Sequence, residues 1–244
     1  MVGSGTGIPS PQRGPAGYLL TVDGQAMLFD CGPGTMERLL RRGFDVRSID
    51  WIFLTHHHPD HCADIIAFIF ANNWEVQRRQ HQPLHLVGPR TTRTFIEKLY
   101  DAFPGLSWTK FAPSIEEWEH GETRSGWTVR GAPVDHADLP ALGYRVEHEG
   151  RAFVYSGDTA ETPRIVELAR GADTLLVECS FPDDVKGQTA HLTAGGAGRV
   201  AHAAGVRRPL RRRNRPRPRR PPPRPIIRGP LFRGHSTVPE IPLP

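Results

Sequence analysis

The sequence contains few cysteines and no long apolar run. Its three cysteines, Cys31, Cys62 and Cys179, cannot all pair and form no Cys-x-x-Cys motif, which excludes a disulfide framework and a thiolate zinc knuckle. No apolar run approaches the roughly 20 residues that cross a bilayer, and the N-terminus lacks a charged segment followed by an apolar one. The sequence therefore predicts a soluble, cytoplasmic protein without a membrane partner.

Acidic residues are nearly absent from the C-terminal end of the chain. Residues 207–244 hold 12 Arg, 11 of the 24 Pro and a single acidic residue, Glu240. The whole chain has a net charge of +5, but residues 1–206 taken alone have −6. This larger part lacks the excess of Lys and Arg with which proteins follow a phosphate backbone.

Apolar periodicity predicts alternating strands and helices over residues 1–206. Two β-prone runs, 18–22 and 25–30, flank Asp23-Gly24, a dipeptide that favours a hairpin turn. Further strands are expected at 51–54, 85–87, 127–134, 143–147, 152–156 and 174–178. Helices are expected after Thr35, as an N-cap, and at 63–72, 92–102, 163–170 and 193–204. Two β-rich halves with interspersed helices fit an α/β fold of four layers, an αββα sandwich.

A histidine cluster follows the strand expected at 51–54. His56 and His58 are two residues apart at a strand end and can point to the same side, and the turn at Pro59 brings Asp60 and His61 to a second position. Catalytic zinc prefers imidazole nitrogen and carboxylate oxygen and keeps one position open for water. The cluster therefore predicts a zinc site.

The spacing His-x-His-x-Asp-His resembles the signature of the metallo-β-lactamase superfamily. The resemblance implies two Zn²⁺ ions: His56, His58 and a later histidine bind the first, and Asp60 and His61 bind the second. His57 occupies the variable slot and is expected to be a neighbour of the site. His136 and Asp158 follow in the superfamily's order, so His136 would complete the first zinc site and Asp158 would bridge both ions.

Residues 136–144 and 155–159 resemble the ribonuclease Z branch of this superfamily. In that branch a metal-bridging water is the nucleophile, and Asp60 would position or deprotonate it. His191 resembles the histidine that donates a proton to the leaving oxygen, and Glu178 the glutamate that orients it. A carboxylate bonded to one ring nitrogen fixes the tautomer and raises the basicity of the other, as a general acid near neutral pH requires. The resemblance also implies a homodimer.

Two features depart from that branch. Its transfer-RNA-binding arm lies between the third histidine and the bridging aspartate, but His136 and Asp158 are only 22 positions apart, and the intervening residues are used by short strands. RNA is therefore not the favoured substrate, and a small phosphodiester or ester is expected. The final zinc ligand, a histidine closing a strand after Val206, is absent, and His235 in the Pro-rich tail is a poor substitute.

The chain is thus expected to comprise a hydrolase domain, residues 1–206, and a disordered Arg/Pro-rich tail, residues 207–244, that replaces the last strand and helix. An abrupt Arg/Pro-rich stretch is also what an out-of-frame reading of a GC-rich gene produces, because Arg and Pro codons are mostly CGN and CCN. The competing account is a natural basic tail, and the coding DNA decides between them.

Three functions remain open from the sequence. The leading one is a zinc-dependent phosphodiesterase. The second is hydrolysis of carboxylic or sulfuric esters at the same dinuclear site. The third is a metal-poor, inactive or binding protein, because the final ligand of the second zinc is missing.

Overall fold

The structure, a computed structural model, describes residues 2–4, 7, 13–74, 84–106, 113–185 and 190–213. All of them belong to a unit formed by residues 1–214, whereas residues 215–244, a separate unit, lie outside the described residues. His235 in the tail, discussed above as a substitute zinc ligand, is among the residues outside the described ranges.

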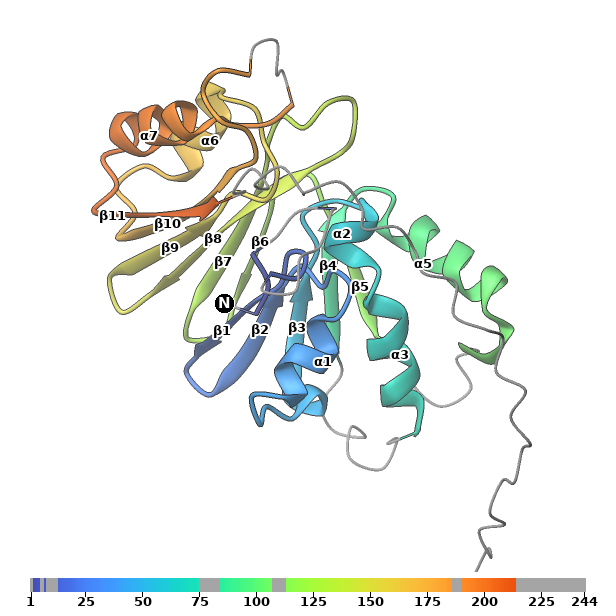
Figure 1. Ribbon diagram of the computed structural model, residues 1–244. Coiled ribbons are helices and arrows are strands. Elements are labelled where there is room, and N and C mark those ends of the chain that lie inside the picture. The colour runs from blue at the N-terminus through green and yellow to red at the C-terminus, as the bar shows by residue number, and fades with distance from the viewer. Residues whose placement is uncertain are drawn as a thin grey trace, which may run out of the picture. The chain divides into compact units, whose positions relative to one another are not determined.

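The first half of the chain forms a five-stranded sheet in the order β1-β2-β3-β4-β5 (Figure 1). Its strands are β1 (Tyr18–Val22), β2 (Gln25–Phe29), β3 (Ile49–Phe53), β4 (His85–Pro89) and β5 (Ser114–Trp118). Its helices are α1 (Thr35–Leu40), α2 (Pro59–Cys62), α3 (Ile65–Trp74) and α5 (Thr92–Ala102), with short 3-10 helices η1 (Val46–Ser48) and η2 (Pro104–Leu106). The β1–β2 hairpin is antiparallel and the other pairs are parallel.

The second half forms a six-stranded sheet in the order β11-β10-β9-β8-β7-β6. Its strands are β6 (Gly121–Arg124), β7 (Thr128–Pro133), β8 (Leu142–His148), β9 (Arg151–Tyr155), β10 (Thr174–Cys179) and β11 (Arg208–Arg213). Helices α6 (Pro163–Leu168) and α7 (Ala194–Ala203) cover it. The chain between His136 and Asp158 consists of a short loop, β8, a turn and β9, which confirms that no arm is inserted there.

The two sheets lie face to face, with helices outside them, because their strands carry apolar side chains on both surfaces. In β3, Trp51 and Phe53 belong to the core between the sheets, and Ile52 belongs to the core beneath the helices. Aromatic rings fill the inter-sheet layer, where Phe29 stacks on Phe53 at 5.0 Å. Such runs, buried on both faces, are expected of strands covered on each side. The predicted αββα sandwich is confirmed.

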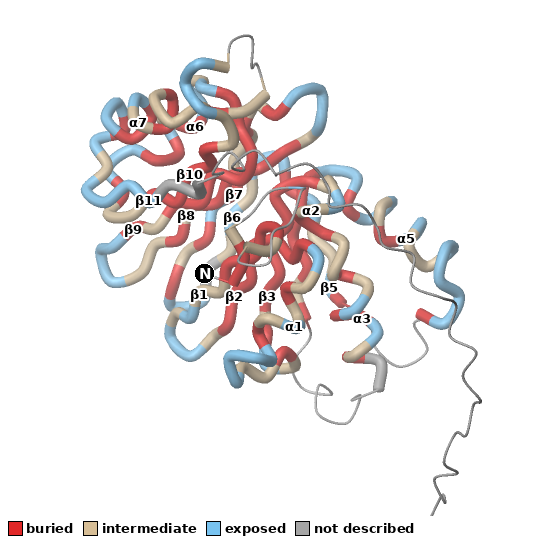
Figure 2. Tube along the Cα trace, in the orientation of Figure 1, coloured by how far each residue is buried: buried red, intermediate tan, exposed pale blue. Residues whose placement is uncertain are grey.

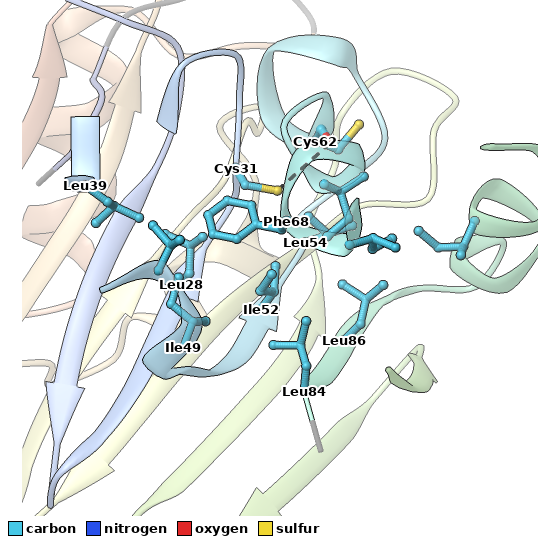
Figure 3. Close-up of a cluster of buried hydrophobic side chains, with 14 of the residues drawn as sticks. Leu28, Cys31, Leu39, Ile49, Ile52, Leu54, Cys62, Phe68, Leu84 and Leu86 are labelled. Carbon is cyan, nitrogen blue, oxygen red and sulfur yellow. Dashed lines mark hydrogen bonds between the residues drawn. The ribbon is translucent and has the colours of Figure 1, made fainter. Parts of the chain in front are cut away.

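Each sheet has its own layer of helices on the outer face. Figure 3 shows the core under α1 and α3, where Leu28 and Ile52 from the sheet meet Phe68 from α3. A second core, of Val154, Val177 and Val200 among others, lies between the other sheet and helices α6 and α7. Figure 2 shows buried residues concentrated along the strands and exposed ones on the outer turns of the helices.

The expectation that nothing after Val206 packs is wrong for residues 208–213. These residues form β11, which pairs in parallel with the whole of β10, from Thr174 opposite Arg208 to Cys179 opposite Arg213. Parallel pairing requires only backbone groups in register, so an Arg-rich segment without apolar alternation still extends the sheet. The domain therefore continues past residue 206, and the remaining tail lies outside the described residues.

Two further expectations need correction. Thr35 is the first residue of α1 and not its N-cap; the carboxylate of Asp64 accepts hydrogen bonds from the backbone N–H groups of Gly34, at 3.0 Å, and Met36, at 2.9 Å. Strands β5 and β6 were not expected, because their sequences are dominated by charged residues and lie at sheet edges.

Candidate active site

The histidine cluster lies where β3 ends. Strand β3 stops at Phe53, the chain then runs extended through Thr55 to His58, and Pro59 occupies the first turn of α2. Proline favours this position because its fixed φ suits the helix and its missing N–H is not needed there. The short helix α2 therefore carries Asp60 and His61 back toward His56.

Three ring nitrogens converge on one point. The Nδ1 atom of His58 lies 3.1 Å from Nε2 of His56 and 3.1 Å from Nε2 of His136. Two nitrogens bound to one tetrahedral zinc, each at about 2.0–2.1 Å, lie about 3.3 Å apart. The three nitrogens thus have the mutual spacing of ligands that share a zinc ion.

The outer nitrogens of His56 and His136 are held by acceptors. Nδ1 of His136 lies 3.1 Å from the carbonyl oxygen of Ala190, which can only accept, so this nitrogen carries the proton and Nε2 keeps its lone pair. The hydroxyl of Thr55 bonds to Asp30 and to Nδ1 of His56 at 3.0 Å, and since it donates to the carboxylate it accepts from the ring. Burial also lowers the pKa of His56 well below its usual value. The inward nitrogens of His56 and His136 are therefore placed as acceptors, and a cation bound between the three rings would take lone pairs from them.

A second group of donors lies beside the first. Nε2 of His61 is 3.4 Å from Oδ1 of Asp158 and 3.7 Å from Oδ2 of Asp60. Single donor atoms of His56, His61 and Asp158 all lie within 4.8 Å of one another, and the same holds for His136, Asp158 and His191. Asp158 therefore lies between the two groups, as a bridging ligand would.

Asp30, to which no sequence motif points, binds His61 on the side of the ring opposite Asp60 and Asp158. Its carboxylate is fully buried and accepts from Nδ1 of His61 at 2.6 Å, from the hydroxyl of Tyr155 at 2.6 Å and from the backbone N–H of Thr55 at 2.8 Å. Burial lowers the pKa of His61, but the charges of Asp158 and Asp30 outweigh it and raise the pKa to about 10. The sequence signal that could have indicated Asp30 is its position as a polar residue directly after the apolar strand β2.

The predicted pair of Glu178 and His191 is present. Oε1 of Glu178 lies 3.0 Å from Nδ1 of His191, and the same carboxylate accepts from the backbone N–H of Thr159 at 2.8 Å and the hydroxyl of Ser180 at 2.6 Å. Glu178 is almost completely buried, whereas His191 is partly exposed and its Nδ1 lies 3.7 Å from Asp158. The ring of His191 is thus fixed at the border of the metal-ligand groups.

The sequence of residues 25–210 matches the family described as the beta-lactamase superfamily domain. The chain belongs to this superfamily. Ribonuclease Z of Mycobacterium marinum is 32% identical over 190 residues, which cover 72% of this chain and 68% of that protein. Ribonuclease Z of Mycolicibacterium paratuberculosis is 30% identical over 189 residues, with the same coverage of 72% and 68%. The chain is accordingly a metal-dependent hydrolase of the ribonuclease Z-like branch.

Solved structures of the superfamily share the fold. The short form of human tRNase Z has a TM-score of 0.76 at 24% identity, covering 86% of this chain and 90% of that one. The metallo-beta-lactamase fold protein YhfI from Bacillus subtilis has a TM-score of 0.73 at 24% identity, covering 86% and 82%. No helix in the described ranges is long and apolar enough to span a membrane.

Within this superfamily site, His57 points away from the other histidines. Its Nε2 lies 3.0 Å from the hydroxyl of Thr92, and its ring stacks on Phe95 at 4.7 Å, both in α5. Burial lowers its pKa to about 4, so the ring is neutral at physiological pH. The structure therefore gives it the place of a neighbour, as the motif predicts.

The resemblance leads us to expect a histidine at the end of a strand after Val206, and the strand found there, β11, contains none. Strand β11 runs beside β10 to its end, with Arg212 opposite Glu178 and Arg213 opposite Cys179. No histidine lies in β11, and His235 is outside the described residues. The second donor group, of Asp60, His61 and Asp158, therefore lacks one imidazole in the described part of the chain.

Proposed function

We propose that this hydrolase is a zinc-dependent phosphodiesterase. The convergence of His56, His58 and His136 at 3.1 Å, with Asp158 close by, is the observation that carries the proposal. Imidazole and carboxylate donors in a dinuclear arrangement suit zinc and the in-line displacement at phosphorus. The ribonuclease Z relatives, whose name denotes cleavage of RNA, support phosphodiesters as the substrate class.

The donors fit two unequal zinc sites. His56, His58 and His136 would supply three ring nitrogens for the first, and Asp60 and His61 would serve the second, with Asp158 close to both. When bound, zinc polarises the phosphoryl oxygens and lowers the pKa of a coordinated water toward about 7. Because β11 brings no histidine, the second site should bind its ion more weakly.

The remaining residues handle protons. The carboxylate of Asp60 is partly exposed beside His61 and can accept the proton of the attacking water. Glu178 binds Nδ1 of His191 and stabilises its protonated form, so the opposite nitrogen can donate a proton to the departing oxygen. His191 acts from a fixed position because Glu178 is itself held by Thr159 and Ser180.

The proposed substrate is a small phosphodiester in preference to a folded transfer RNA. Residues between His136 and Asp158 form only β8, β9 and their connections, so no arm extends from this edge. The net charge of −6 over residues 1–206 also opposes a long polyanion. We also propose that the protein is cytoplasmic and forms a homodimer. Sedimentation of the purified chain tests the homodimer.

Paired chromogenic substrates test the proposed reaction. The zinc-loaded chain should hydrolyse bis(p-nitrophenyl) phosphate faster than p-nitrophenyl butyrate or p-nitrophenyl sulfate. Asp158→Asn should abolish the activity, while His202→Ala, which removes an exposed histidine of α7, should leave it unchanged. Faster turnover of a carboxylic or sulfuric ester would favour the second function, and no turnover with zinc bound would favour a binding protein.

A further inference from the structure

A cavity of about 280 Å³ lies at the edge of the sheets that carries the histidines. One wall is the β4–α5 turn with Pro89 and Arg90, and another is the end of β5 with Trp118 and Glu119. The third wall is the loop after β7, residues 134–141. Small-molecule sites have volumes of about 300–1,000 Å³, so this cavity holds a single ring system and not a larger ligand.

Two walls of the cavity contain chain neighbours of residues in or beside the candidate active site. Asp135 and Ala137, which flank His136 in the chain, both line it. Arg90 in the opposite wall directly precedes Thr91 and Thr92, whose hydroxyls contact His57. Two walls of the cavity thus come from chain segments that also carry His136 or contact His57.

The lining combines apolar surface with charges that have no protein partner. Among the residues that the structure describes, Arg90, Glu119 and Asp138 form no hydrogen bond or ion pair. In contrast, Arg164 and Asp135 in the same lining neutralise each other at 3.1 Å. Leu139, 41% exposed, adds apolar surface beside Asp138. Unpaired charges next to apolar walls suit a flat ring with polar edges.

We infer that this cavity binds the nucleobase next to the scissile phosphodiester, and that it prefers guanine. Carboxylates only accept hydrogen bonds, and guanine offers adjacent N1–H and N2–H donors that one carboxylate, such as Asp138, can accept together. Uracil presents two carbonyl acceptors around one N–H and is repelled by the same group. Guanidinium planes also stack on bases, which gives Arg90 a role at the ring face. The inference rests on the proposed function and narrows its substrate class.

Calorimetric titration of the full-length, EDTA-treated chain tests the subsite without any metal. GMP should bind, whereas UMP and inorganic phosphate should bind at least about 10-fold more weakly. Asp138→Ala and Arg90→Ala should each weaken GMP binding by about 10-fold or more. The matched controls Glu97→Ala and Lys98→Ala remove the same charges from exposed positions of α5 and should change nothing.

Kinetics separates failure of the subsite from failure of the proposed function. Asp138→Ala should raise KM for the p-nitrophenyl ester of GMP by about 10-fold and leave bis(p-nitrophenyl) phosphate unaffected. Equal GMP binding by the wild type and both variants, or equal binding of GMP and UMP, would overturn the subsite. Binding of GMP by a chain that cleaves neither reporter would keep the subsite and refute the phosphodiesterase.

Discussion

At the scale of single residues, the site is organised by buried carboxylates behind the histidines. Asp30 and Glu178 each bind the Nδ1 atom of one histidine, His61 and His191. The opposite nitrogen of His61 faces Asp60 and Asp158, whereas Nδ1 of His191 itself also lies 3.7 Å from Asp158. Such outer partners set the tautomer and orientation of a ring that binds metal or transfers protons. Each carboxylate thus orients one histidine: we expect Asp30 to affect metal binding through His61, and Glu178 to affect proton transfer through His191.

Replacing Asp30 by Asn should weaken zinc binding by about 10- to 100-fold, the typical effect of losing a carboxylate behind a metal-binding histidine. The amide keeps the size of the side chain but removes the charge that holds His61. Tyr155→Phe is the matched control, because it deletes one hydrogen bond to Asp30 and leaves the carboxylate in place. Competition with a chromogenic chelator measures the affinity. Identical zinc affinity in wild type and Asp30→Asn would show that Asp30 only supports the fold.

Replacing His191 by Gln should lower kcat by about 10²- to 10⁴-fold, the usual contribution of general acid catalysis, and leave zinc content unchanged. A substrate with a good leaving group, such as a p-nitrophenyl ester, needs less protonation and should show the smaller loss, whereas an alkyl phosphodiester should show the larger one. Equal losses with both leaving groups would contradict a proton-donor role for His191.

At the scale of secondary-structure elements, close backbone contacts hold α2 against the loop that follows β2, where the N–H of Cys31 donates to the carbonyl of His61 at 2.7 Å. A Cβ atom at Gly32 would lie 2.0 Å from the backbone carbonyl oxygen of Asp60, so no side chain fits there. Gly32→Ala should displace α2 and destabilise the fold by about 1–3 kcal/mol, as overpacking does. Gly105→Ala, which meets no atom within 4 Å, is the control. Urea denaturation followed by circular dichroism measures both, and equal midpoints would refute the contact.

Strand β11 should stabilise the fold although its sequence is poorly suited to a strand. Its backbone covers all of β10, from Thr174 to Cys179, and a chain that ends at Val206 would leave that edge unpaired. We expect the chain ending at Val206 to have a clearly lower Tm than one ending at Asn214. If thermal unfolding of the two chains coincides, the pairing contributes nothing to stability.

Much of the fold follows from the sequence where apolar periodicity and turn residues agree. The hairpin at Asp23-Gly24 and the helix at 92–102 appear as expected, with Asp23 and Gly24 at positive φ. Capping of α1 by Asp64 could not be foreseen, because the two are about 30 residues apart and only the folded chain brings them together. Strand β11 was missed because backbone pairing leaves no trace in side-chain pattern.

The candidate site was predictable to a similar extent. The His-x-His-x-Asp-His motif gives four site residues from one short segment, and family order supplies His136, Asp158 and the Glu178–His191 pair. The role of Asp30 depends on hydrogen bonds from Thr55 and Tyr155, which are distant from it in the sequence. No local sequence pattern reveals such contacts.

At the scale of the whole molecule, the site joins the two halves of the chain. The first sheet supplies His56, His58, Asp60 and His61, and the second supplies His136, Asp158, Glu178 and His191. Aromatic residues between the sheets, including Phe53 and Tyr144 at 5.2 Å, keep the halves in register. Metal binding should therefore stabilise the complete sandwich, because only the folded chain brings these donors together.

The number of zinc ions bound per chain tests the central claim most directly. After equilibration with zinc and gel filtration, mass spectrometry of the metal should find at least one ion per wild-type chain. His58→Ala should lose it, since two of the three converging nitrogens cannot hold zinc as tightly, while His202→Ala should retain it. Unchanged zinc content in His58→Ala, or none in the wild type, would contradict the account.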